Sequence, residues 1–191
     1  MADINQVNFA YIKKWEGGLS KNPKDSASKH PVPDGSGYHT NMGVTWATWQ
    51  FHFGKDVAGF YAMPFDKWKK VYLFYWNLVG GASISSQIIA EFLADWAWAS
   101  GVNAPRQLQY YLYNTGYYKH TPDGVAGKQT VAALEAIIKS RGELVVYEEL
   151  YNYRVKWLQK IPAFKDFGRG WMNRLEDFNR YAEEVLKVDG E

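Results

Sequence analysis

Apolar side chains recur every three or four positions along most of this 191-residue chain, which is the spacing of one face of an α-helix. Prolines open and glycines close several of these segments, as they do at helix ends. Helices are expected over residues 64–76, 88–100, 105–115, 131–138, 142–160 and 166–187. No long run alternates between apolar and polar residues, although a short hairpin within residues 19–44 fits the pattern. The chain is therefore expected to be an all-α, orthogonal assembly of helices.

Another helical segment, at the N-terminus, leads to a carboxylate. Its apolar positions are Ile4, Val7, Tyr11 and Trp15. Asp3 with Gln6 resembles a capped start, and Gly17-Gly18 would end the helix directly after Glu16. The macrodipole is negative at that end and Trp15 sheds water, so both effects favour the protonated carboxyl. A general acid needs that form near neutral pH, which makes Glu16 the candidate catalytic acid.

The segment from residue 19 to 39 is polar and has no sustained period. Loops of this length in compact domains are usually functional or disordered. Thr45 is a candidate N-cap for the next helix, and this return of the chain would bring Asp25 and Thr40 toward Glu16. Glycoside hydrolysis uses such a pair, because one carboxylic acid protonates the leaving oxygen and a second carboxylate activates water or attacks the sugar. The alternative is a helix end followed by a plain surface loop, since carboxylates nine apart occur by chance.

Six short motifs follow one another along the chain. They are Glu16-Gly17-Gly18, Asn22-Pro23-Lys24-Asp25, Thr40-Asn41-Met42-Gly43-Val44-Thr45, Tyr75-Trp76, Asp95-Trp96-Ala97-Trp98-Ala99-Ser100-Gly101 and Gly170-Trp171-Met172-Asn173-Arg174. Their order and spacing resemble glycoside hydrolase family 108, the N-acetylmuramidases also labelled secretion-activator proteins. The resemblance implies a helical, lysozyme-like muramidase in which Glu16 is the catalytic acid.

The chain departs from the family pattern in the loop after Glu16. The stretch between Asp25 and Thr40 is longer than family members usually carry, which leaves two choices for the second carboxylate. Asp25 keeps the spacing to Glu16, whereas Asp34 keeps the approach to the Thr-Asn turn. The insertion is most simply placed after Asp25, so Asp25 is preferred. Leu19 also replaces the tyrosine that commonly follows the two glycines.

Residues 101–191 resemble the helical peptidoglycan-binding half that accompanies this family. The residues that carry this resemblance are Leu108, Gln109, Leu112, Asp123-Gly124, Gly127, Thr130 and Ala133-Leu134. The Asp-Gly turn predicts a tight loop whose exposed amides could face a ligand; a plain helix–turn–helix is the alternative. We therefore expect a catalytic part over residues 1–100 and a peptidoglycan-binding part over 101–191. The junction at 100–103 is too short for a flexible linker, so the two are expected to pack as one unit.

The nine tryptophans and fourteen tyrosines supply aromatic faces that could stack on sugar rings. Most are expected in the core, because they fall on periodic apolar positions: Trp68, Trp96, Trp157 and Trp171. The candidates for a saccharide cleft flank the motifs: Tyr38, Trp46, Trp49 and Trp98. Asn41 and Asp95, inside the matched motifs, complete the predicted substrate-binding set.

Composition excludes several classes of function. A net charge of +2 is too small to indicate nucleic-acid binding, and no phosphate-cradling glycine loop is present. Without cysteine there is no disulfide framework and no thiol nucleophile. His30, His39, Asp25 and Asp34 match no metal-ligand spacing, so a solvated loop is preferred and neither metal nor cofactor is expected. The N-terminus has no classical signal peptide and no apolar run could span a membrane, so export to the cell wall would need a holin or a dedicated system.

The sequence thus predicts an N-acetylmuramidase that cleaves the β-1,4 bond between N-acetylmuramic acid and N-acetylglucosamine in peptidoglycan. Glu16 would protonate the leaving oxygen, Asp25 would deprotonate or position water, and Thr40 or Asn41 would help to hold that water. The rival is a non-catalytic cell-wall-binding or secretion-accessory protein with the same fold. A chitinase acting on related glycans is a third possibility. Phage lysis, wall remodelling and secretion all remain open as biological settings.

Overall fold

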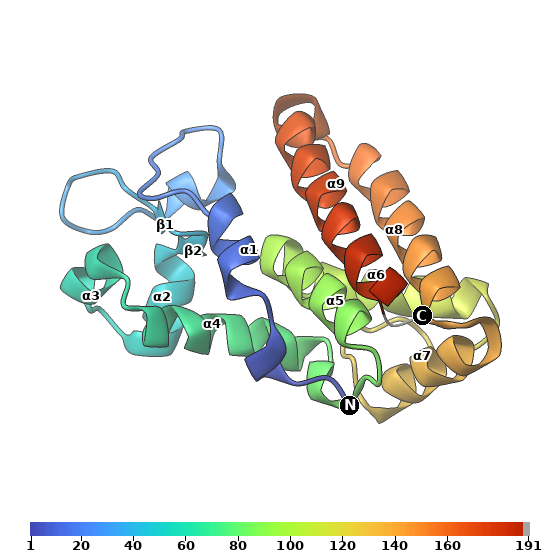
Figure 1. The fold of residues 1–191 in the computed structure, drawn as a ribbon. Coiled ribbons are helices and arrows are strands. Elements are labelled where there is room, and N and C mark those ends of the chain that lie inside the picture. Colours follow the sequence, from blue (N-terminus) through green and yellow to red (C-terminus); the bar gives the residue numbers. More distant parts are fainter. Residues whose placement is uncertain (189–191) are drawn as a thin grey trace. The chain divides into compact units, whose positions relative to one another are not determined.

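The computed structural model describes residues 1–188, and its regular structure there consists of α-helices, three short 3-10 turns and one small hairpin (Figure 1). The all-α class is therefore confirmed, and the small hairpin is present but ends at Thr45, one residue beyond the predicted range of 19–44. The chain divides into two compact units. We call residues 8–74 the N-terminal unit, and residues 1–7 with the chain from Tyr75 onward the C-terminal unit. This structural division differs from the predicted functional division at residue 100, which stays a prediction.

The N-terminal unit holds the first elements of the chain. They are α1 (Phe9–Trp15), a 3-10 turn (Ser26–Lys29), β1 (Thr40–Asn41), β2 (Val44–Thr45), α2 (Trp46–Phe53), α3 (Val57–Ala62) and most of α4 (Phe65–Leu78). One core cluster brings Phe9 against Trp68 and Tyr72, with ring centroids 6.1 and 5.4 Å apart. A second brings Phe60 against Trp46 and Trp49, at 5.3 and 6.1 Å.

The hairpin pairs Thr40 with Thr45 and Asn41 with Val44 in antiparallel register. Its two turn residues, Met42 and Gly43, have φ of 45° and 76°, as a type I′ turn requires. Glycine adopts this conformation easily, whereas methionine rarely does. The indole N–H of Trp68 donates to the carbonyl of Met42 at 2.9 Å and stabilises the turn.

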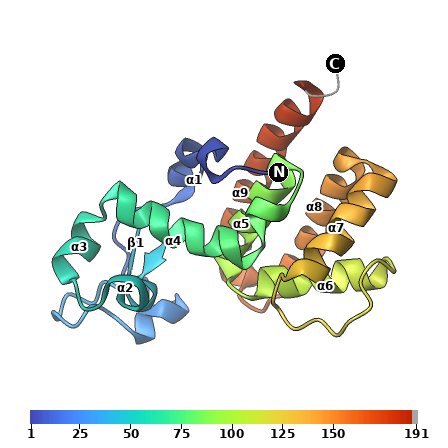
Figure 2. The same cartoon turned by 90° about the horizontal axis from the view of Figure 1, so that it is seen from below.

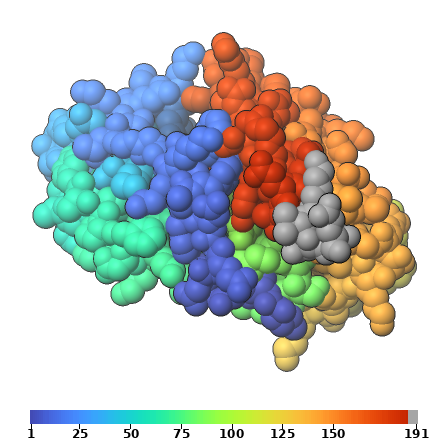
Figure 3. All heavy atoms as spheres, viewed as in Figure 1, coloured from blue at the N-terminus to red at the C-terminus, as the bar shows by residue number. Residues whose placement is uncertain are grey.

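The C-terminal unit is built around α5 (Gln87–Ser100), in which every residue from 88 to 98 is buried. The other elements are 3-10 turns at Ile4–Gln6 and Gly81–Ser83, α6 (Asn103–Asn114), α7 (Lys128–Arg141), α8 (Glu143–Gln159) and α9 (Phe164–Val188). Helices α8 and α9 run side by side (Figures 1 and 2) and form adjoining red and orange ridges in the space-filling view (Figure 3). Phe92 of α5 packs on Tyr147 of α8 and Phe178 of α9, at 5.4 and 5.5 Å.

The expected N-terminal helix is not continuous. Asp3 does cap a start, with its carboxylate accepting from the Asn5 amide at 2.9 Å, but this start is a 3-10 turn. The side chain of Asn8 then accepts from the amide of Tyr11 at 3.0 Å and begins α1 anew. A polar cap in the middle of an apolar period thus divides the segment. None of the helices in the described part of the chain combines the length and apolar character needed to span a bilayer.

Candidate active site

Glu16 is the residue at which α1 ends. Its backbone is extended, with φ −90° and ψ 110°, and its N–H donates to the carbonyl of Lys13 at 3.2 Å. The side chain is half-buried, whereas Gly17 and Gly18 are exposed. Neither glycine has a positive φ, and a Cβ added to either would meet no atom within 4 Å. Close packing therefore does not require glycine at either position. The two glycines leave the surface next to Glu16 without side chains.

Asp25 begins the 3-10 turn in the long loop. One of its carboxylate oxygens accepts from the amide of Ala27 at 2.9 Å, and its own amide donates to the carbonyl of Asn22 at 3.0 Å. The side chain is half-buried. Asp25 is thus fixed by the loop itself, with a second carboxylate oxygen that this cap does not use.

Thr40 lies beside the segment that follows Glu16. The amide of Ser20 donates to the Thr40 carbonyl at 2.8 Å, and the amide of His39 donates to the Ser20 carbonyl at 3.0 Å. Thr40 therefore pairs with Ser20, which follows Glu16 by four residues in the sequence, and the predicted role of Thr40 beside Glu16 stays a prediction.

His39 is a residue whose role the sequence did not reveal. It was expected in a solvated loop, but its side chain is buried, with 1% of its surface exposed. Nδ1 lies 2.9 Å from the Thr40 hydroxyl and Nε2 lies 3.2 Å from the Asn22 carbonyl. Since a carbonyl only accepts, Nε2 carries a proton, and in the neutral ring Nδ1 accepts the proton of Thr40. The one sequence signal was its place directly before Thr40.

Asp34, the alternative second carboxylate, is exposed and is held by a different set of contacts. One of its oxygens accepts from the Ser36 amide at 2.9 Å, and the other accepts from the Tyr61 hydroxyl. Hydrogen bonds from Ser36 and Tyr61 lower the pKa of Asp34 to about 2. Asp34 is therefore ionised at neutral pH and tied to α3.

The aromatic candidates differ in exposure. Trp46 and Trp49 are buried, and the indole N–H of Trp49 donates to the Asp56 carbonyl at 2.8 Å. Trp98, in the C-terminal unit, is buried against Tyr75 at 5.4 Å. Tyr38 is half-buried, with Lys21 Nζ 5.4 Å from its ring centre. Of the four, Tyr38 offers the most accessible face for a sugar.

Two polar residues of the predicted substrate-binding set are buried in internal networks. The side-chain amide of Asn41 donates to the carbonyls of Phe60 and Tyr61 at 2.7 and 3.1 Å. Asp95, with 1% of its side chain exposed, forms ion pairs with Arg154 and Arg174 in the C-terminal unit at 3.0 and 2.6 Å. These contacts give both residues a structural task, and their predicted contact with substrate stays a prediction.

The Asp-Gly loop of the C-terminal unit uses its amides internally. The amide of Gly124 donates to the side chain of Gln109 at 2.8 Å, and that of Val125 donates to Asp123 at 2.8 Å. The amide of Gly127 donates to the Val125 carbonyl at 2.8 Å. The expectation that amides of this loop face a ligand is therefore wrong for these three. Among residues 1–188, no group of three His, Cys, Asp or Glu side chains is placed to hold a metal.

The chain is similar to a known protein family and to a solved structure. The family model of glycosyl hydrolase 108 matches residues 9–101, which contain five of the six motifs and confirm the resemblance to this family. Among solved structures, SagA of Brucella abortus is similar, with a TM-score of 0.70 and 28% sequence identity over 92% of this chain and 91% of that chain. No curated protein matches the chain.

Proposed function

Residues 9–101 belong to glycosyl hydrolase family 108, and from this we propose that the chain is an N-acetylmuramidase that hydrolyses peptidoglycan. The bond cut is the β-1,4 link between N-acetylmuramic acid and N-acetylglucosamine. The observation that carries the proposal is the place of Glu16 inside the matched segment, at the end of α1 and beside two exposed glycines that packing does not require. The exposed glycines add no side-chain bulk next to Glu16, which supports the approach of a glycan strand to the carboxyl.

In the proposed reaction, Glu16 gives its proton to the glycosidic oxygen as the bond to the anomeric carbon breaks. Asp25 stabilises the developing positive charge and takes a proton from the water that attacks that carbon. Thr40, whose hydroxyl proton is directed to His39 in the neutral ring, offers the water a lone pair and so helps to orient it. The products are two shorter glycans, one of which carries a new reducing end.

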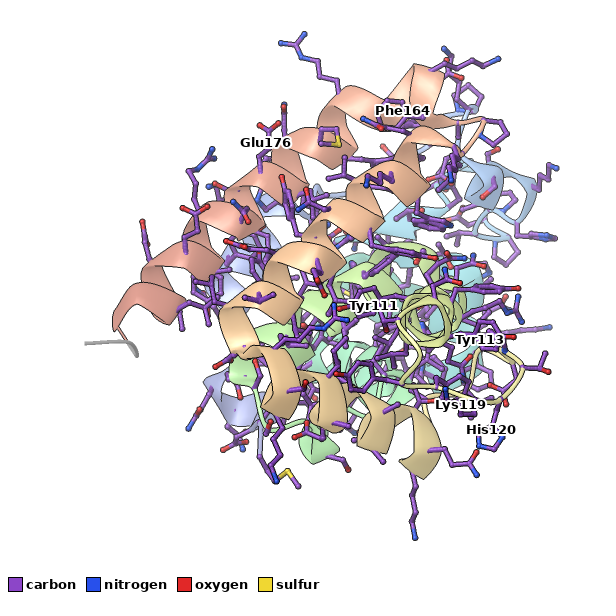
Figure 4. The ribbon with its side chains drawn as sticks, turned by 90° about the vertical axis from the view of Figure 1, so that its right-hand side faces the viewer. Tyr111, Tyr113, Lys119, His120, Phe164 and Glu176 are labelled. Atoms are coloured by element: carbon purple, nitrogen blue, oxygen red, sulfur yellow. The ribbon has the colours of Figure 1, made fainter. Side chains whose placement is uncertain are left out.

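The assay that tests this proposal is the clearing of purified peptidoglycan, with release of reducing sugar as the readout. Wild type should release reducing ends, and Glu16→Gln should lose at least about 100-fold in rate, the scale of one general acid. Glu176→Gln, at an exposed glutamate of α9 labelled in Figure 4, is the matched control and should keep full activity. Thermal unfolding and co-sedimentation with the wall show whether Glu16→Gln is folded and still binds.

Other outcomes would assign a different function. If wild type binds the wall tightly but releases no reducing sugar, the chain is a wall-binding or secretion-accessory protein. If chitin oligomers are cut faster than peptidoglycan, the enzyme is a chitinase. We further propose that the protein acts on the cell wall and reaches it through a holin or a dedicated export system. Fractionation of producing cells, with and without such a system, tests that step.

A further inference from the structure

Lys21 lies at the backbone pairing between the start and the end of the long loop. Its neighbour Ser20 pairs with Thr40 through a backbone hydrogen bond of 2.8 Å, and Glu16 precedes Lys21 by five residues. Because an extended chain covers at most about 3.6 Å per residue, the Cα atoms of Glu16 and Lys21 are no more than about 18 Å apart. A glycan of a few sugars is long enough to contact both residues.

The ammonium group of Lys21 is exposed and free to bind an anion. No salt bridge within residues 1–188 uses it, whereas Lys67 pairs with Asp56 at 2.7 Å. Its Nζ lies 5.4 Å from the ring centre of Tyr38, and a cation–π contact of this kind is weak at an exposed site. Tyr38 therefore steadies the ammonium group while leaving its N–H donors to a ligand.

Tyr38 is itself held by the long loop. Its carbonyl accepts from the Val32 amide at 2.7 Å, and its amide donates to the Ser36 hydroxyl at 3.2 Å. The Tyr38 ring packs edge-on against Tyr61, with ring centres 6.3 Å apart. The Tyr61 hydroxyl donates to Asp34 and lies 2.8 Å from the Ser36 hydroxyl. These contacts anchor the loop to α3 and fix the Tyr38 ring before a ligand arrives, which lowers the entropy lost on binding.

The unit that carries Lys21 is positively charged. Residues 8–74 contain nine lysines, no arginine and five acidic residues, which gives a net charge of +4, although the whole chain carries only +2. The rest of the chain is therefore slightly acidic. A positive unit attracts anionic polymers from solution, so charge complementarity favours a substrate that carries carboxylates over a neutral one.

We propose that Lys21 binds a carboxylate on the lactyl branch of N-acetylmuramic acid and so helps the protein to distinguish peptidoglycan from chitin. This inference rests on the proposed function. The lactyl branch ends in a free carboxylate or, through an amide bond, in a stem peptide that has carboxylates of its own. An ammonium group forms a charge-assisted hydrogen bond with either kind of carboxylate. N-Acetylglucosamine has neither, so a chitin strand gains nothing from Lys21.

The test compares the binding of soluble, uncross-linked peptidoglycan strands before and after their carboxylates are converted to amides. Amidation removes the negative charge and leaves the sugars unchanged. Affinity is measured by isothermal titration with Glu16→Gln protein, so that cleavage cannot deplete the ligand. Lys21→Gln is introduced into this protein. Lys29→Gln, which removes the same charge from an exposed site in the same loop, is the matched control, and Lys21→Arg tests whether restored charge restores binding.

Lys21→Gln should weaken the binding of untreated strands by about fivefold, the upper range for one exposed ion pair, and should lose most of the response to amidation. Lys29→Gln should lose less than about twofold and keep that response, and Lys21→Arg should bind as the parent protein does. Two kinds of strand identify the source of the carboxylate. Strands freed of peptides by an amidase carry the lactyl carboxylate, whereas intact strands carry only peptide carboxylates, and the Lys21 effect appears with the kind that is bound.

The proposal is overturned if Lys21→Gln and Lys29→Gln weaken binding equally, or if amidation has the same effect on both variants, because Lys21 would then contribute only to the general charge. Failure of the proposed hydrolysis gives a different result. A wild-type protein that releases reducing sugar but shows no Lys21 effect would remove this inference alone. A protein that shows the Lys21 effect but releases no reducing sugar would remove the proposed hydrolysis and keep the carboxylate site.

Discussion

Arg174 donates two hydrogen bonds to a single carboxylate oxygen of Asp95, from Nη2 at 2.6 Å and from Nε at 3.0 Å. Arg154 donates to the other oxygen at 3.0 Å. Burial alone would raise the pKa of Asp95, but the charges of Arg174 and Arg154 outweigh it and hold the pKa below its usual value. Asp95 therefore stays ionised and links α5 to α8 and α9 within the C-terminal unit.

Asp95→Asn should destabilise the protein strongly. The variant leaves two cations without their shared carboxylate in a buried site, a loss of about 3–5 kcal/mol in the free energy of unfolding. Glu176→Gln, on the same helix as Arg174 but exposed, should change it by less than about 0.5 kcal/mol. Urea unfolding followed by tryptophan fluorescence measures both. An Asp95→Asn protein of wild-type stability with weakened glycan binding would instead support the predicted contact with substrate.

The stabilisation from Asp95 should depend on pH in one direction. Its folded-state pKa lies below the ordinary value of 3.8, so folding favours the ionised form. The contribution is complete above pH 3.8 and is lost as the pH falls through the lower, folded-state pKa. The difference in unfolding free energy between wild type and Asp95→Asn should therefore be constant from neutral pH down to the ordinary pKa and shrink below it. A difference that grows on acidification would contradict this assignment.

Helices with long, regular apolar periods were predictable from the sequence. The segments expected at 142–160 and 166–187 are α8, Glu143–Gln159, and α9, Phe164–Val188, because each buries one continuous stripe between clear end signals. The N-terminal segment was not predictable in this way. There Asn8 competes for the backbone and starts a new helix, and periodicity does not register such a local cap.

The positions of candidate site residues were predictable where neighbouring residues in the sequence determine them. They were not predictable where contacts of the long loop determine them. The end of α1 at Glu16 follows from the chain nearby, and so does the Thr45 cap, which accepts from the Thr48 amide at 3.1 Å. The burial of Trp46 and Trp49 on α2 depends instead on Phe60, which lies on the next helix, α3. Contacts between segments distant in sequence leave no periodic signal. The loop around His39 is held by contacts of this kind, such as the one between His39 and Asn22.

Asn41→Ala should test whether this amide is structural. The variant would leave the carbonyls of Phe60 and Tyr61 without their donor, and a buried group left unpaired costs about 1–3 kcal/mol. We expect the free energy of unfolding to fall by about 2–3 kcal/mol while KM for peptidoglycan stays near that of wild type. A stable variant with a raised KM would show that Asn41 contacts the glycan, as the sequence predicted.

His39→Gln should loosen the long loop, because the Thr40 hydroxyl and the Asn22 carbonyl both bind its ring. Loss of a buried side chain that makes two hydrogen bonds should lower the free energy of unfolding by about 1–3 kcal/mol. Amide hydrogen exchange should quicken at Ser20 and Trp46, whose N–H groups bind carbonyls of Thr40 and His39. His30→Gln is the matched control, since His30 is exposed in the same loop, and equal exchange in the two variants would deny His39 this role.

Two variants of Asp25 test whether it is the second catalytic carboxylate, because one removes only its charge and the other also removes its cap on the 3-10 turn. Asparagine keeps a side-chain oxygen, so Asp25→Asn can still accept from the Ala27 amide while losing its charge. If Asp25 stabilises the transition state, Asp25→Asn should lower kcat by at least about 100-fold with little change in unfolding temperature, the range of one acid–base group. Asp25→Ala should lose the cap as well and unfold at a lower temperature.

Asp34→Asn is the comparison that makes this result decisive. Asp34 is exposed and its carboxylate is engaged with Ser36 and Tyr61, so its variant should retain wild-type kcat. The opposite pattern, with activity lost in Asp34→Asn and kept in Asp25→Asn, would transfer the role to Asp34 and place the insertion before it. Retention of activity in both variants would leave Glu16 as a single acid, with water activated by groups other than a carboxylate of this loop.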